Sequence, residues 1–173
     1  GLFAEARKRK LPTMLRTVGL VPSPTGAVRH DIARTLAQGG ARVRLLLSPT
    51  RVQGEGSALE IAAAIERLTE RDDVDVIIVA RGGGSAEELW SFNEGVVARA
   101  IAASGPPVIS AVGHESDVTV ADLVADIRAS TPSFAAGVVV DVQRRANQRT
   151  EAGQAALQAA IELSRERWRR RLE

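Results

Sequence analysis

The stretch DVIIVA, at residues 75–80, constrains the fold more than any other part of this 173-residue chain. Its middle is apolar and β-branched without alternation, which is typical of a strand covered by helices on both faces. Further apolar runs with the length of buried strands lie at residues 17–21, 41–47 and 108–112. A sheet made of such strands needs helices on both sides.

Segments with helical patterns alternate with these strands. They are predicted at residues 27–38, 57–69, 94–103 and 119–126. In the second of these segments, Leu59, Ile61, Ile65 and Leu68 recur at helical spacing. Strands and helices in strict alternation, joined by short links, are typical of βαβ crossovers. The sequence therefore predicts an α/β fold, Rossmann-like, with an open, mainly parallel sheet and flanking helices over residues 17–131.

The two ends of the chain differ from this central region. Residues 1–16 are basic and aperiodic, and we expect a linker or arm there. Residues 132–173 have helical composition throughout, which predicts one long helix of about 60 Å at 1.5 Å per residue. Its Ala-rich apolar positions favour the start of a coiled coil, and the alternative is two helices broken near Gly153. Because the chain opens on Gly1 and stops within a helical pattern, we expect a fragment.

Composition sets weaker limits. The chain has no cysteine, and it has neither a secretory leader pattern nor an apolar run of membrane-spanning length, so we expect a soluble, cytoplasmic protein. The formal net charge is only +2, which makes charge weak evidence for a nucleic-acid partner.

Polar or glycine-rich loops directly follow all four predicted strands. They are residues 23–26, 48–54, 81–85 and 113–117. Because the carboxyl ends of parallel strands share one edge of a sheet, we expect these loops to converge in one ligand crevice.

Two of these loops have the chemistry of phosphate binding. Arg81 offers a planar fork of donors, and the glycines after it allow close backbone approach to an anion. The expected ligands in this loop are Arg81, Gly82, Gly83, Gly84 and Ser85. In the first loop they are Ser23, Thr25 and Gly26, which precede a helix start. The alternatives are a tight turn with a solvent-facing Arg81 and a simple capping turn.

Candidate proton carriers lie in the same loops or close to them. The imidazole of His114 can transfer protons near neutral pH, and Asp117 could orient it or take a proton itself. Asp31 lies one turn into the first predicted helix, where it could also simply complement the helix dipole. Trp90 and Phe92 are expected in the core, with stacking on bases as the alternative.

Several nucleotide-binding folds are excluded, since no G-x-G-x-x-G follows the first strand and no Walker sequence is present. A flavodoxin-like flavin or nucleotide site stays open, because residues 23–26 could hold a flavin phosphate. Against it, the chain has few aromatic residues for stacking.

The chain resembles the large subunit of exodeoxyribonuclease VII. The matching stretches are SPTGAVRHDI (residues 23–32), VARGGGSAEELWSFN (residues 79–93) and VISAVGHESDVTVADLVADIRASTPS (residues 108–133). The resemblance implies an exonuclease that hydrolyses single-stranded DNA to oligonucleotides, with Asp31, Arg81, His114 and Asp117 as catalytic residues. It also implies an N-terminal OB-fold outside this chain.

Partners and cofactors follow from the same resemblance. Small subunits of exodeoxyribonuclease VII would bind through the C-terminal helix. No metal would be obligatory, with Asp31 and Asp117 as candidate ligands if Mg²⁺ is used. Three hypotheses therefore stand: the nuclease, a flavin- or nucleotide-binding domain, and an inactive scaffold for small-subunit helices.

Overall fold

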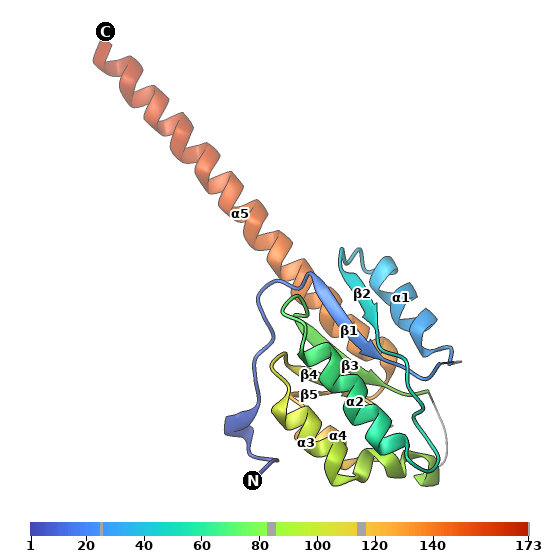
Figure 1. The fold of residues 1–173 in the computed structure, drawn as a ribbon. Coiled ribbons are helices and arrows are strands. Elements are labelled where there is room, and N and C mark those ends of the chain that lie inside the picture. The colour runs from blue at the N-terminus through green and yellow to red at the C-terminus, as the bar shows by residue number, and fades with distance from the viewer. Residues whose placement is uncertain (25, 83–85, 114–116, 173) are drawn as a thin grey trace.

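A five-stranded parallel sheet forms the centre of the computed structural model, which describes residues 1–24, 26–82, 86–113 and 117–172 (Figure 1). The strands are β1 (Thr17–Val21), β2 (Arg44–Leu47), β3 (Val76–Ala80), β4 (Val108–Ala111) and β5 (Ile127–Arg128). Their order is β2-β1-β3-β4-β5, and every neighbouring pair is parallel. The predicted α/β fold with an open parallel sheet is confirmed.

Helices cover both faces of this sheet, as a strand like β3 requires. They are α1 (Val28–Gln38), α2 (Ser57–Thr69), α3 (Gly95–Ala103), α4 (Val120–Val124) and α5 (Pro132–Leu172), with 3₁₀ segments η1 (Glu5–Arg7) and η2 (Ala86–Asn93). Ile77 and Val79 of β3 pack in the core under α2, α3 and α4, whereas Val76 and Ile78 pack in the core under α1 and α5. The alternation of a β-strand thus divides one apolar run between two cores.

Four elements differ clearly from the prediction: β2, β5 and the two 3₁₀ segments. β2 begins at Arg44 rather than at residue 41, because β1 begins at Thr17 and Thr17 is the register partner of Arg44. Residues 41–43 therefore have no strand to pair with. β5, η1 and η2 were not predicted, since a two-residue strand and 3₁₀ segments leave no measurable periodicity in the sequence.

The C-terminal helix runs without interruption through Gly153, so the alternative of two helices is wrong. Its first part belongs to the α/β body, where Ala135, Ala136 and Val139 are fully buried against α1 and the sheet. Residues 151–170 are all exposed and project away from the body (Figure 1). The start of a coiled coil stays a prediction, since α5 has no second helix beside this part within the described residues.

Candidate active site

A pocket of about 520 Å³ opens beyond the carboxyl ends of β1 and β3. Its lining residues are Ser23, Gly26, Ala27, Val28, Asp31, Val52, Gln53, Arg81 and Gly82. The strand order reverses here, because β1 has β2 on one side and β3 on the other. Ligands of open α/β sheets bind at such a switch point. The structure thus brings residues of three of the four polar loops to one place.

Arg81 extends β3 into this pocket. Its backbone N–H donates to the carbonyl of Ala111 at 3.1 Å, which continues the pairing with β4. Its side chain is almost fully buried, and Nη2 donates to Oε1 of Gln53 at 3.3 Å. The alternative of a solvent-facing arginine is therefore wrong. A guanidinium held in a low-dielectric wall attracts an anion more strongly than one in water.

The loop between β1 and α1 forms a second wall. A Cβ on Gly26 would lie 3.0 Å from Oγ of Ser23, so the absence of a side chain lets this hydroxyl come close. The N-cap of α1 is Ala27, whose side chain makes no capping hydrogen bond. The first-turn amides of α1 are therefore suited to an anionic ligand in the pocket.

Asp31 lies in the first turn of α1 and lines the same pocket. Its side chain is 44% exposed, and Oδ1 lies 3.6 Å from Nη1 of Arg34. A carboxylate that is half in solvent can exchange a proton or bind a cation without a large desolvation cost. Both the catalytic role and the helix-dipole role agree with this position.

The loop between β2 and α2 is held by Glu60. Its carboxylate accepts from Nε of Arg51 at 2.8 Å and, more weakly, from the Thr50 hydroxyl at 3.4 Å. The Arg51 hydrogen bond is the main cause that holds the pKa of Glu60 below its usual value. This anchor fixes the loop that presents Val52 and Gln53 to the pocket, and Gln53 in turn contacts Arg81. Sequence reasoning pointed to this loop but not to Gln53.

The loop after β4 depends on a close backbone approach. A Cβ on Gly113 would overlap with the carbonyl oxygen of Asp117, so only glycine fits this turn. The Asp117 residue itself is exposed and does not line the switch-point pocket.

A buried carboxylate, Asp122, holds the far side of this loop. Oδ1 accepts from Oγ of Ser110 in β4 at 2.6 Å, and Oδ2 accepts from the backbone N and Oγ1 of Thr119 at 2.9 and 2.8 Å. Asp122 is 3% exposed and forms a capping box with Thr119 at the start of α4. Sequence reasoning missed this residue, although a threonine three positions before an acid is a capping-box signal.

The two aromatic residues of η2, Trp90 and Phe92, differ in their exposure to solvent. Phe92 is fully buried, which confirms the core prediction for it. Trp90 is 69% exposed, so the core prediction is wrong for this residue. Its neighbours explain the difference, because Ser91 is fastened to Ser57 by a hydroxyl pair at 2.6 Å and Asn93 accepts from the N–H of Val120 at 2.9 Å. With residues 91–93 fixed inward, the indole at position 90 faces solvent.

The structure therefore places the predicted site residues in three groups. Those in the switch-point pocket are Ser23, Gly26, Asp31, Arg81 and Gly82. Asp117 lies outside the lining of this pocket. Thr25, Gly83, Gly84, Ser85 and His114 lie outside the described residues. Among the residues that are described, no group of three or more His, Cys, Asp or Glu side chains could hold a metal ion.

These features define a parallel α/β protein with a pocket at its topological switch point that is lined by the buried Arg81. The family model for exonuclease VII, large subunit, matches residues 2–173. The chain therefore belongs to this family.

Curated relatives agree with this assignment. The exodeoxyribonuclease 7 large subunit of Syntrophotalea carbinolica is 61% identical over 140 residues, which cover 81% of this chain and 35% of that protein. The protein of the same name from Desulfitobacterium hafniense is 51% identical over 173 residues, which cover 100% of this chain and 43% of that protein. The chain thus spans less than half the length of these relatives.

Neither the comparison with solved structures nor a search for membrane-spanning helices adds to the functional assignment. The crystal structure of Treponema denticola PurE matches 85% of this chain and 95% of its own with a TM-score of 0.49 and 11% identity, which carries no functional argument. None of the helices in the described part of the chain is both long and apolar enough to cross a membrane.

Proposed function

We propose that this chain carries the active site of an exonuclease that hydrolyses phosphodiester bonds of single-stranded DNA to oligonucleotides. One observation carries the proposal: the buried guanidinium of Arg81 lines a switch-point pocket in a chain of the exonuclease VII large-subunit family. Relatives in this family are named exodeoxyribonucleases, which is consistent with a phosphodiester substrate.

Hydrolysis needs charge stabilisation at phosphorus. A water oxygen attacks, the bond from phosphorus to the leaving oxygen breaks, and the products are a phosphate monoester and a hydroxyl. Arg81 and the amide of Gly82 would hold the non-bridging oxygens, together with Gly83, Gly84 and Ser85. Each preorganised donor of this kind contributes about 10²–10³-fold to the rate. Ser23, Thr25 and Gly26 would bind a phosphate at the start of α1.

Proton transfer falls to the acidic and imidazole groups. His114 would take a proton from the water or give one to the leaving oxygen, a role worth roughly 10²–10⁴-fold. Asp117 would orient His114. Asp31, which lines the pocket, is a second candidate proton carrier. The tight turn at Gly113 supports this proposal, because it fixes the backbone next to the segment that carries the histidine.

We propose that no metal ion is obligatory for this reaction. Arg81 supplies the positive charge that a cation would otherwise supply. If Mg²⁺ binds, Asp31 and Asp117 are the carboxylates that would hold it, since hard cations prefer oxygen ligands.

The partner of this chain is proposed to be the small subunit of exodeoxyribonuclease VII. The exposed part of α5 carries Leu157, Ile161 and Trp168, each at least half exposed. The separations of four and seven residues place them on one helix face. A face of this kind is stabilised by packing on another helix.

The strand order β2-β1-β3-β4-β5 is also that of flavodoxin-like proteins, which keeps the shape of the rival flavin site. Family membership favours the nuclease over that rival and over an inactive scaffold.

The test is cleavage of an end-labelled single-stranded oligonucleotide at protein excess, with and without EDTA, by the wild-type chain and by His114→Ala. We expect chelator-resistant product that His114→Ala fails to make. If the wild type makes no product, the assay is repeated with the full-length large subunit and small subunits. No cleavage there, or equal cleavage by His114→Ala, would sink the assignment.

A further inference from the structure

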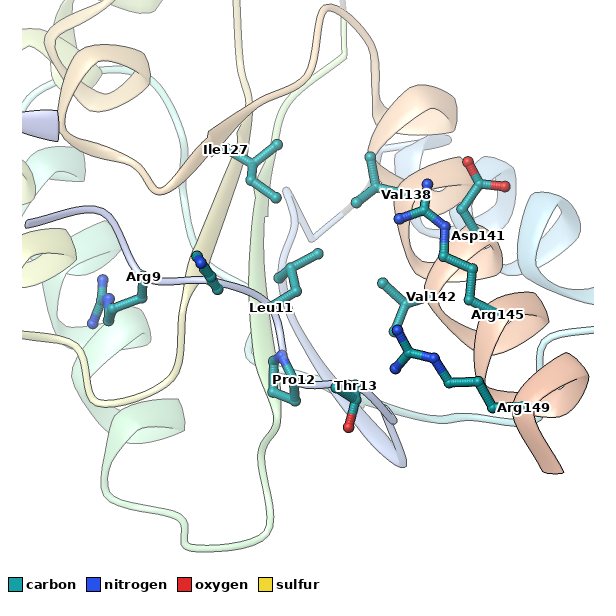
Figure 2. Close-up of a pocket in the computed structure, with 11 residues that line it drawn as sticks. Arg9, Leu11, Pro12, Thr13, Ile127, Val138, Asp141, Val142, Arg145 and Arg149 are labelled. Carbon is teal, nitrogen blue, oxygen red and sulfur yellow. The ribbon is translucent and has the colours of Figure 1, made fainter. Parts of the chain in front are cut away.

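A second pocket, of about 570 Å³, lies at the opposite end of the strands from the switch-point pocket. The N-terminal arm at residues 9–13, Ile127 of β5 and one face of α5 form its walls (Figure 2). Its place follows from Asp126, which precedes β5 and accepts from the N–H of Val108, the first residue of β4, at 2.6 Å. This groove therefore lies at the amino ends of the strands, whereas the candidate active site lies at their carboxyl ends.

The groove is held open by fixed contacts of the arm. Arg9 donates to Asp126 from its backbone N at 2.6 Å, from Nε at 3.0 Å and from Nη2 at 2.8 Å, and the Asp126 side chain is only 2% exposed. Further along, the side-chain amide of Gln143 in α5 donates to the carbonyl of Leu15. These contacts tie both ends of the arm segment to the body, so the groove exists before any ligand binds.

Its walls combine an apolar surface with unneutralised positive charge. Leu11, Val138 and Val142 contribute the apolar part. Lys10, Arg145 and Arg149 line the same groove, and within the described part of the chain these three cations make no hydrogen bond or ion pair. Figure 2 shows Arg149 reaching from α5 towards the arm and Arg145 lying along α5 beside Val138 and Asp141.

The other charged residues that line the groove are internally paired, which leaves the three cations for a ligand. Arg9 is bound to Asp126, and the carboxylate of Asp141 accepts from Nη2 of Arg144 at 2.8 Å.

We propose that this groove binds a segment of single-stranded nucleic acid remote from the cleaved bond, an inference that rests on the proposed function. Phosphates would contact Lys10, Arg145 and Arg149, and bases or sugars would lie on Leu11 and Val138. A basic groove with apolar walls has the chemistry that single strands need. Contacts far from the reacting bond hold the substrate in place for the chemical step.

The experiment measures binding of a fluorescein-labelled 20-nucleotide thymidine oligomer to the complete chain by anisotropy, over a series of salt concentrations in EDTA. The variant is Arg145→Ala with Arg149→Ala. Its matched control is Arg165→Ala with Arg169→Ala, which removes the same charge at the same spacing on the exposed part of α5. Circular dichroism confirms that each variant is folded.

We expect the groove variant to bind more weakly, with a shallower salt dependence. For single strands the slope of log K against log[salt] changes by about 0.7 for each phosphate that the protein neutralises, so removing two cations reduces it by about 1.4. The control should keep the wild-type slope. Equal changes in both variants, or no change in either, would overturn the proposal, and so would displacement of the oligomer by an equally charged poly-glutamate.

Failure of this proposal is distinguishable from failure of the proposed function. A changed slope in a protein that never cleaves DNA would retain the groove and remove the nuclease. Cleavage of DNA by the wild type, together with an unchanged salt slope in the groove variant, would retain the nuclease and remove the groove.

Discussion

At the scale of single residues, Asp122 and Gly113 make the contacts that hold the described residues between β4 and α4. Asp122 is buried, and three donors from Ser110 and Thr119 converge on its carboxylate. Gly113 allows the carbonyl of Asp117 to approach to a distance that no other residue permits. Neither residue is proposed to touch the substrate. Their contacts hold Asp117 and Thr119, which follow His114 in the sequence.

Asp122→Ala should destabilise the protein. Alanine removes both acceptor oxygens, so the buried backbone N–H of Thr119 would lose its hydrogen-bond acceptor. A buried donor left without an acceptor costs about 1–3 kcal/mol. Urea unfolding should show this loss, with a smaller loss of about 1 kcal/mol for Ser110→Ala. Glu162→Gln, on the exposed part of α5, is the control and should unfold like the wild type. An unchanged midpoint for Asp122→Ala would refute the stabilising role of this carboxylate.

At the scale of elements, the sequence predicts what periodicity and length can encode. The helix predicted at residues 57–69 matches α2 at both ends, because an apolar stripe runs along its whole length. β5 escaped prediction because two residues have no pattern, and its place in the sheet comes from pairing with β4. The candidate site was likewise predictable in part. Loop positions after strands were predictable, whereas the contact of Gln53 with Arg81 depends on how two loops meet in space.

The 3₁₀ segment η2 leads to a prediction of its own. Its inward residues are fixed to α2 and α4, so Trp90 is a preorganised and exposed aromatic surface. Trp90→Ala should weaken binding of single-stranded DNA by about 1–3 kcal/mol, the usual cost of losing one stacked base. Trp168→Ala is the control, because this indole is 63% exposed on the far part of α5. The check is anisotropy with a labelled oligonucleotide, and equal affinities for both variants would count against stacking at Trp90.

At the scale of the whole molecule, the chain divides between a packed α/β body and a helix that leaves it. α5 is part of the core up to Ala146 and exposed over residues 151–170. Deleting residues 151–173 should therefore shift the thermal midpoint by less than about 2 °C, since a loss of 1 kcal/mol shifts a domain of this size by about 2–4 °C. Deleting all of α5 should prevent folding, because Ala135, Ala136 and Val139 would leave the core. A large shift for the shorter deletion would show that the exposed part stabilises the isolated chain.

The central claim is that the switch-point pocket is where phosphodiester bonds are hydrolysed, and the rate of cleavage by Arg81→Lys tests it most directly. Lysine keeps the charge but lacks the planar fork of donors. The matched control is Arg71→Lys, because Arg71 pairs with Asp73 on the surface between α2 and β3. The account predicts a rate of single-stranded DNA cleavage about 10²-fold or more below wild type for Arg81→Lys, and a wild-type rate for the control. A wild-type rate for a folded Arg81→Lys protein would contradict the account.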